Sequence, residues 1–189
     1  MSLVETYLQE TIRHLQNYPI EDFNKVVAIL KEARANGNKI FLIGNGGSGS
    51  TASHFANDII KNTIQEGQPR VRCIALTDNM PIIMAIANDW DYSRIFVEQL
   101  IPLAKPNDVL IGFSGSGDSA NIIKAMEWAK ENQVKVIALG GRDGGKMKSI
   151  ADVSVIMSTN SMAQIEDAHL ITNHMLFLSM ICDTRPPLM

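Results

Sequence analysis

Five short and nearly uninterrupted apolar runs recur along the chain, and helical segments separate them. The runs span residues 39–44, 71–76, 108–114, 134–140 and 153–157. Strands that are apolar throughout must be covered on both faces, and this is typical of parallel sheets whose crossovers are helices. The pattern therefore predicts an α/β fold, a three-layer sandwich on a five-stranded parallel sheet of the doubly wound, flavodoxin-like kind.

Helical periodicity fills the stretches between and around these runs. Two helices are predicted before the first strand, over 4–15 and 20–35, and the second ends at an Asn36-Gly37 cap signal. Further helices are predicted over 48–63, within 77–100, and over 119–132, 146–150 and 162–181. We interpret residues 1–189 as a single domain with an N-terminal helical extension of about 1–36, because the length suits one core and no linker interrupts it.

Composition excludes several classes of protein. A hydrophobic content of 46% argues against disorder, and 17 basic against 20 acidic residues give a formal charge of −3, so no nucleic-acid partner is expected. No apolar run approaches the ~18–20 residues that cross a membrane, and no signal pattern opens the chain. Cys73 and Cys182 are isolated and fit reduced thiols. We expect a soluble cytoplasmic protein without a membrane partner.

Two of three glycine-rich loops resemble nucleotide-binding motifs, but incompletely. Residues 44–49 have the G-x-G-x-x-G spacing of dinucleotide sites, yet the nearest later acid, Asp78, lies too far along the chain. Residues 140–146 match G-x-x-x-x-G-K, but Met147 follows where a hydroxyl residue binds magnesium. We therefore expect no nucleotide cofactor, and we interpret residues 140–146 as a strand-to-helix turn.

The middle loop, residues 114–119, points to a phosphate group. Ser114, Ser116 and Ser119 follow an apolar strand and precede a helix. Hydroxyls, backbone amides and a helix N-terminus together suit one phosphate monoester, although serines here also serve as plain helix caps. The loop resembles residues 44–49, and both follow strands whose carboxyl ends meet at one edge of a parallel sheet, where ligands bind.

Histidines and carboxylates on two predicted helices form a candidate metal site. His54 and Asp58 are four residues apart and share a helix face. Glu166 and His174 are separated by about 12 Å along a later helix, so they converge on one ion only by reaching inward, and His169 is a rival partner for Glu166. Two imidazoles with two carboxylates suit zinc. The alternative is that these histidines cap a helix or pack in the core.

Together these residues resemble the sugar isomerase (SIS) domain family, in particular its phosphoheptose isomerase branch. The similarity spans nearly the whole chain and is carried by segments 44–48, 54–56, 74–76, 85–89, 114–119 and 166–174. The resemblance implies conversion of D-sedoheptulose 7-phosphate to D-glycero-D-manno-heptose 7-phosphate through an enediolate. It also implies homotetramers with sites at subunit interfaces, and one zinc ion per subunit.

The resemblance further implies a set of site residues. Those implied to contact the substrate are Asn45, Gly46, Gly47, Ser48, Asp58, Asn88, Asp89, Ser114, Gly115, Ser116, Ser119 and Glu166. Those implied to surround the metal are His54, Asp58, Glu166 and His174. Isomerisation needs a base and an acid, which we assign to Asp58 and His174; Asp58 cannot be fully a ligand and fully a base at once.

Four positions depart from the family pattern. Asp58 stands where Glu is usual, Glu166 where Gln is usual, Asn62 where Arg is common and Ala163 where Asp is usual. A shorter carboxylate shifts the base by more than an ångström, which can cost about 10²-fold in rate. The alternative function is therefore a noncatalytic SIS module that binds a phosphosugar or a protein partner. Retention of both Asp58 and His174 favours the enzyme.

Overall fold

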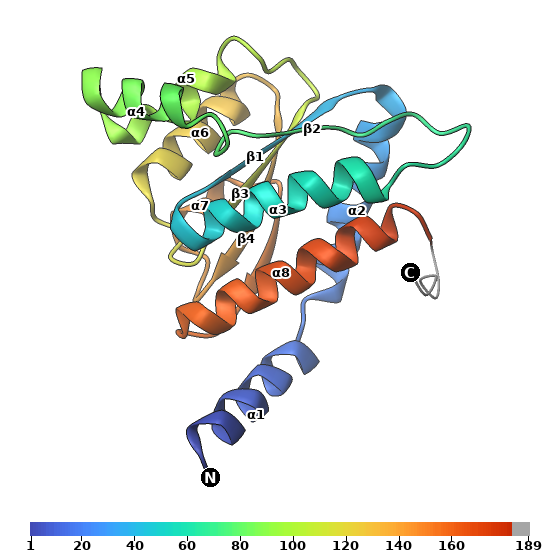
Figure 1. Ribbon diagram of the computed structural model, residues 1–189, viewed down its shortest axis with the longest axis vertical. Coiled ribbons are helices and arrows are strands. Elements are labelled where there is room, and N and C mark those ends of the chain that lie inside the picture. Colours follow the sequence, from blue (N-terminus) through green and yellow to red (C-terminus); the bar gives the residue numbers. More distant parts are fainter. Residues whose placement is uncertain (183–189) are drawn as a thin grey trace.

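Five parallel strands form the central sheet of the computed structural model, which describes residues 1–182 (Figure 1). The strands are β1 Lys39–Gly44, β2 Arg72–Ala75, β3 Val109–Ser114, β4 Lys135–Gly141 and β5 Val153–Met157. Their order in the sheet is β2-β1-β3-β4-β5, and every neighbouring pair is parallel. The predicted α/β class and the five-stranded parallel sheet are confirmed. The chain changes direction across the sheet between β1 and β3, which places the loops after these two strands side by side.

Helices cover both faces of the sheet, because successive strand residues point to opposite sides. The helices are α1 Leu3–Gln16, α2 Ile20–Asn36, α3 Gly46–Asn62, α4 Met80–Asp89, the 3-10 helix η1 Tyr92–Arg94, α5 Val97–Leu100, α6 Ala120–Glu131, α7 Gly145–Ile150 and α8 Met162–Ser179. Ile40 and Leu42 of β1 join the core under α2, α3 and α8. Phe41 and Ile43 join the opposite core under α4 to α7.

The segment between β2 and β3 is less regular than the sequence predicts. Helical structure was expected to continue through residue 100, but α4 stops at Asp89 and two short helices follow. Trp90 leaves the helical conformation at φ −126° and ψ −93°, and the Asp91 side chain accepts a hydrogen bond of 2.7 Å from the Ser93 amide. An aspartate that caps the next turn ends one helix and begins another.

One buried arginine ties the ends of three helices together. Arg34 of α2 donates to the Thr63 carbonyl after α3 (3.0 Å) and to the Met180 carbonyl after α8 (3.3 Å). It also donates to the Pro69 carbonyl at 2.8 Å. Carbonyls at helix C-termini lack intrahelical partners, so one guanidinium satisfies the ends of both α3 and α8. This contact fixes α3 and α8 as neighbours.

Helix α1 stands apart from the sheet and contacts α8 through polar groups (Figure 1). The Tyr7 hydroxyl donates to Asp167 at 2.6 Å, whereas none of the residues of α1 is buried. Leu3 and Leu8 are 85% and 56% exposed, and Val4 and Ile12 are exposed as well. In the part of the chain that the structure describes, none of the helices combines the length and the apolarity that crossing a membrane requires.

Candidate active site

The loops after β1 and β3 enclose a hollow of about 320 Å³ at the carboxyl edge of the sheet. We call it the hydroxyl hollow. Nine of the twelve residues implied for the substrate line it: Asn45, Gly46, Gly47, Ser48, Ser114, Gly115, Ser116, Ser119 and Glu166. It lies where parallel α/β sheets bind ligands, at the point where the strand order reverses.

The three serines of the middle loop have different local roles. Ser114 Oγ accepts a 3.0 Å hydrogen bond from the Gly117 amide, and Ser116 Oγ accepts one of 3.3 Å from the Asp118 amide. Ser119 occupies the N-cap position of α6, yet its side chain makes no capping hydrogen bond. The first two hydroxyls shape the loop, and the Ser119 hydroxyl together with the first amides of α6 is available to an anion.

Two residues that the sequence analysis missed hold Asn45 in place. Asn121, which is 2% exposed, exchanges two hydrogen bonds with Asn45, of 2.7 and 2.9 Å between side-chain amides. The Tyr92 hydroxyl also donates to Asn45 Oδ1, at 3.2 Å. A buried polar residue needs such partners. The signal for Asn121 was present, since an asparagine in the apolar first turn of α6 calls for an explanation.

Glu166 lines the hydroxyl hollow and lies apart from His54, Asp58 and His174, which we call the histidine cluster. Its carboxylate lies against Gly47 at the start of α3. His174, on the same helix, is two turns farther on, a rise of about 12 Å. The structure therefore does not bring Glu166 to the ion site implied for it, because the inward reach that this required does not occur.

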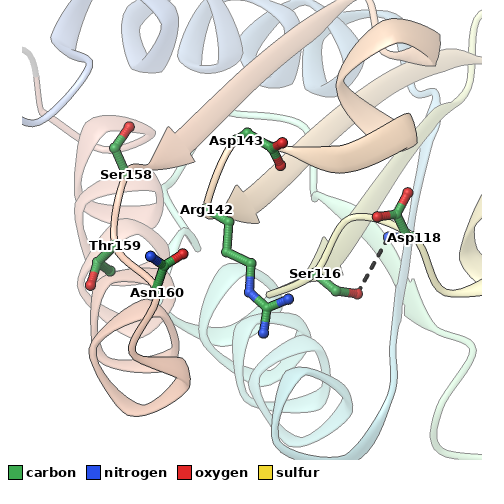
Figure 2. A pocket seen from close by; sticks show the side chains of 7 residues that line it. All are labelled: Ser116, Asp118, Arg142, Asp143, Ser158, Thr159 and Asn160. Atoms are coloured by element: carbon green, nitrogen blue, oxygen red, sulfur yellow. Dashed lines mark hydrogen bonds between the residues drawn. The ribbon is translucent and has the colours of Figure 1, made fainter.

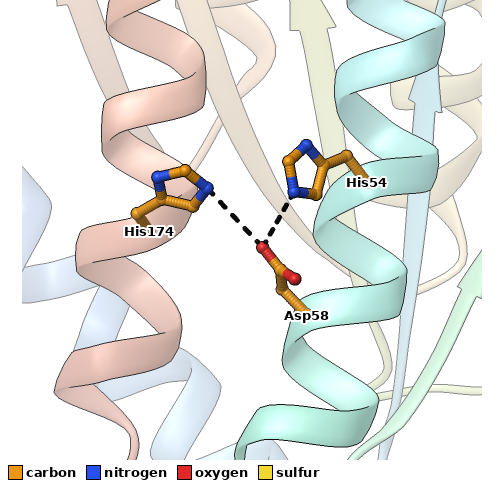
Figure 3. Close-up of side chains that lie close together, drawn as sticks. All are labelled: His54, Asp58 and His174. Atoms are coloured by element: carbon orange, nitrogen blue, oxygen red, sulfur yellow. Dashed lines mark ion pairs between the residues drawn. The ribbon is translucent and has the colours of Figure 1, made fainter. Parts of the chain in front are cut away.

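Three side chains from α3 and α8 converge between the two helices (Figure 3). Asp58 Oδ2 lies 3.2 Å from His54 Nε2 and 3.7 Å from His174 Nε2. The two imidazole rings are 5.5 Å apart between centroids and stand edge to face. One donor atom from each residue lies within 4.8 Å of the others. Both histidine side chains are 45% exposed, so His174 is not the core histidine that the alternative interpretation required.

The second carboxylate oxygen of Asp58 is held by two amides. Asn57 Nδ2 and Asn62 Nδ2 donate to Asp58 Oδ1 at 3.2 and 3.3 Å. Asn62, one of the four positions that depart from the family pattern, therefore helps to orient the Asp58 carboxylate. With Oδ1 held in this way, Oδ2 faces the histidines.

His169 is the core histidine of α8. It is 2% exposed, packs edge-on against Phe113, and neither ring nitrogen has a hydrogen-bond partner among the described residues. Burial lowers the pKa of His169 to about 4, an effect that the nearby Gly140 backbone partly opposes. The choice between His169 and His174 is thereby made, because only His174 faces Asp58.

Asn88 and Asp89 are not brought to either group within this chain. Both are exposed at the C-terminal end of α4, where Asn88 Nδ2 donates to Asp89 Oδ1 at 2.7 Å. Neither residue lines the hydroxyl hollow. Neither residue belongs to the group formed by His54, Asp58 and His174.

The histidine cluster suits a divalent cation in kind and in number of donors. Two imidazole nitrogens and one carboxylate oxygen are the donor set of many catalytic zinc sites, which leave one position open. The cluster is displaced from the hydroxyl hollow along both helices. On α3, His54 lies about 12 Å beyond Gly46, and on α8, His174 lies the same distance beyond Glu166. The arrangement can hold an anion at one end of an extended ligand and move protons at the other.

Comparisons with known proteins identify the family to which the chain belongs. Residues 5–141 match the family model described as "SIS domain". The chain is 40% identical over 168 residues to a phosphoheptose isomerase of Aliarcobacter butzleri (strain RM4018), covering 88% of this chain and 87% of that protein. It is 38% identical over 169 residues to a phosphoheptose isomerase of Helicobacter pylori (strain ATCC 700392 / 26695), covering 89% and 85%.

Solved structures show the same similarity. A phosphoheptose isomerase from Neisseria gonorrhoeae superposes with a TM-score of 0.87 at 32% identity, over 94% of this chain and 96% of that one. A phosphoheptose isomerase from Francisella tularensis superposes with a TM-score of 0.88 at 28% identity, again over 94% and 96%. Because only about 6% of the chain lies outside each of these two superpositions, the similarity extends into α8.

Proposed function

The chain belongs to the SIS domain family, and from its similarity to the phosphoheptose isomerases we propose that it interconverts D-sedoheptulose 7-phosphate and D-glycero-D-manno-heptose 7-phosphate. The observation that carries the proposal is the placement of Asp58 between two imidazoles, on the same two helices whose N-terminal parts line the hydroxyl hollow. An isomerase that acts on sugar phosphates needs both features, an anchor for the phosphate and a centre for proton transfer.

The separation between the two ends supports a long sugar. The axial offset of about 12 Å, from Gly46 to His54 on α3 and from Glu166 to His174 on α8, suits an extended heptose with its phosphate in the hydroxyl hollow and its first two carbons near the two histidines. A three-carbon phosphosugar anchored in the same way falls short of Asp58. Seven carbons are thus favoured by the spacing as well as by the relatives.

Asp58 and His174 are proposed as the base and the acid. Asp58 Oδ2 removes a proton from C1 of the ketose, and the electron pair forms the C1–C2 double bond of an enediolate. His174 then protonates O2; return of a proton to C2 and loss of the O1 proton complete the aldose. Proton transfer by positioned groups of this kind contributes about 10²- to 10⁴-fold.

The same proposal includes one zinc ion per subunit, held by His54, Asp58 and His174. The donor set that supports it is two imidazoles and a carboxylate. A bound divalent cation would polarise the sugar oxygens and favour the charge that develops on them. His54, which is not needed for proton transfer, would then be purely a ligand. Asp58 Oδ2 would serve both as a ligand and as the base, so one of the two roles is partial.

We further propose a homotetramer in the cytoplasm. The apolar residues of α1 and of α4, among them Leu8, Met80 and Met84, are exposed in the single chain and need a cover. Asn88 and Asp89, which also lie on the surface, then contact sugar bound by a neighbouring subunit. The two free cysteines suit a reducing compartment.

Proton NMR in deuterium oxide tests the proposal, with sedoheptulose 7-phosphate and shorter ketose phosphates, with and without added zinc. Loss of the C1 proton signal together with an aldose signal is the expected result. The His174→Gln variant is expected to keep the fold and lose turnover, and an unchanged kcat would remove His174 as the acid. Binding without exchange for any sugar would replace the enzyme by a noncatalytic phosphosugar-binding module.

A further inference from the structure

The third glycine-rich loop, residues 140–146, remains without a role in the proposed reaction. It follows β4 and packs against residues 114–119, which we call the serine loop. The Met147 amide donates to the Gly117 carbonyl at 3.0 Å, and the Lys146 amide donates to Asp118 Oδ1 at 3.0 Å. The backbones of Gly117 and Gly144 approach so closely that no Cβ atom fits on Gly117, whose φ is +72°. The loop that resembles a nucleotide motif is therefore a backing for the serine loop.

Arg142 in this loop projects its side chain into a second hollow. This hollow has a volume of about 520 Å³ and shares Ser116 with the hydroxyl hollow. Figure 2 shows the Arg142 side chain extending toward Ser116 and away from Asp143. Its backbone is in the left-handed region at φ +56°, and its amide donates to the Thr159 carbonyl at 3.2 Å. Non-glycine residues held in this region cluster at functional sites.

The guanidinium of Arg142 forms no hydrogen bond or ion pair with any residue in the range 1–182. The two carboxylates in its hollow have other partners, since Asp118 accepts from the Lys146 amide and Asp143 from the Gly145 amide at 3.1 Å. An exposed arginine thus stands beside the serine loop with its donors open.

The hydroxyl hollow has no cation of its own. Across both hollows and the described residues, Arg142 is the one basic residue in the lining, and Glu166 adds a negative charge to the hydroxyl hollow. A phosphate monoester there would meet hydroxyls and amides, but no positive charge to balance its two negative ones. Guanidinium groups match phosphate oxygens with two parallel donors.

We propose that Arg142 is a binding and specificity-determining residue, whose guanidinium reaches past Ser116 to contact the substrate phosphate. The inference rests on the proposed function, since it places the phosphate in the serine loop. Arg142 supplies the charge that selects a phosphorylated sugar over the free sugar, and it does so from outside the G-x-G-x-x-G and serine loops. The third glycine-rich loop thereby gains a role in substrate choice.

Three variants test the proposal: Arg142→Gln, Arg142→Lys, and the matched control Lys146→Gln, which removes the same charge four residues on from a side chain that lines neither hollow. The dissociation constant for inorganic phosphate is measured by calorimetry, and KM and kcat with the heptose phosphate. Arg142→Gln is expected to weaken phosphate binding and raise KM by about 10- to 100-fold with little change in kcat. For Arg142→Lys, the dissociation constant for phosphate and KM are expected to lie between those of the parent and of Arg142→Gln. For Lys146→Gln, both are expected to stay within about twofold of the parent.

Phosphate affinity that is unchanged in Arg142→Gln, or equally reduced in Lys146→Gln, would overturn the proposal, and so would a parent protein that does not bind phosphate. If Arg142→Gln fails to fold, full phosphate affinity in Arg142→Lys overturns the bidentate contact and a reduced affinity supports it. Phosphate binding that depends on Arg142 in a protein without isomerase activity would uphold this inference and reject the proposed function.

Discussion

The backbone of Gly47 at the start of α3 lies directly against the carboxylate of Glu166 on α8. A Cβ atom on residue 47 would overlap Glu166 Oε1, so the two positions are matched in size. The N-terminal ends of the two helices that carry the histidine cluster therefore meet through one residue without a side chain and one with a carboxylate. The residue at each of these two positions therefore limits the size of the side chain that fits at the other.

Gly47→Ala is expected to destabilise the protein by no more than about 1 kcal/mol, because the atoms that it meets are the far end of the flexible Glu166 side chain. In a Glu166→Ala background the same substitution is expected to cost much less, because the carboxylate is gone. Urea unfolding of the parent, the two single variants and the double variant measures the coupling. Additive effects would show that Glu166 has room to move aside without cost.

The cation site predicts a specific loss of metal-induced stability. Zinc that binds only the folded chain raises the free energy of unfolding, by about 2.7 kcal/mol when free zinc is a hundred times the dissociation constant. The thermal midpoint rises with it. Asp58→Asn removes the anionic donor between the histidines and is expected to abolish most of this gain. Glu127→Gln, which removes an exposed acid of α6, is the control and is expected to keep it. Chelator treatment with elemental analysis fixes the stoichiometry; far less than one ion per chain would argue against the site.

Ser119 and Ser114 are expected to separate binding from stability. Ser119→Ala removes no capping bond, so its effect on unfolding is expected to stay within about 0.5 kcal/mol while phosphosugar affinity falls about tenfold or more. Ser114→Ala leaves the Gly117 amide without its acceptor and is expected to cost about 1–3 kcal/mol of stability. Calorimetric titration with the phosphosugar and urea unfolding give the two readouts. A Ser119→Ala variant with full affinity would move the phosphate away from α6.

His169 predicts a loss of stability in mild acid. Its pKa of about 4 in the folded chain is below the ordinary value of about 6.5, so the unfolded chain takes up the proton first as the pH falls. The free energy of unfolding is therefore unaffected by protonation of His169 above pH 6.5 and falls between pH 6.5 and 4, by on the order of 3 kcal/mol. Urea unfolding at pH 7 and pH 4.5 is expected to show a smaller difference for His169→Leu than for the parent. His14→Gln, which leaves His169 in place, is expected to retain the full difference.

The sheet and most helices could be predicted because their signals are local. Runs such as Val109–Ser114 are apolar on both faces and end at glycine or serine, which is enough to identify buried strands. The break at Trp90 was missed because residues 80–89 and 97–100 share apolar character, and the cap from Asp91 acts over only two residues. The end of α4 could not be predicted because helix and turn are both compatible with the residues around Trp90.

The candidate site could be predicted in its residue types but not in its grouping. His54 and Asp58 pair because four residues along one helix fix their distance. Which of Glu166, His169 and His174 joined the group depended on how α8 packs on α3, and no spacing within α8 contains that information. Asn121 is identified by its hydrogen bonds to Asn45 and Arg142 by the hollow that it lines with Ser116, and both features appear only in the folded chain, so a search for known motifs passes over these residues.

Helix α1 has a thermodynamic consequence for any handling of this protein. Fourteen residues are marginal as an isolated helix in water, and here none is buried against the rest of the chain. If the apolar stripe of α1 is covered by a second copy, the coil-to-helix equilibrium of these residues is bimolecular. Dilution then unwinds α1, residues 3–16, before it disturbs the sheet, and the helical ellipticity per residue depends on protein concentration.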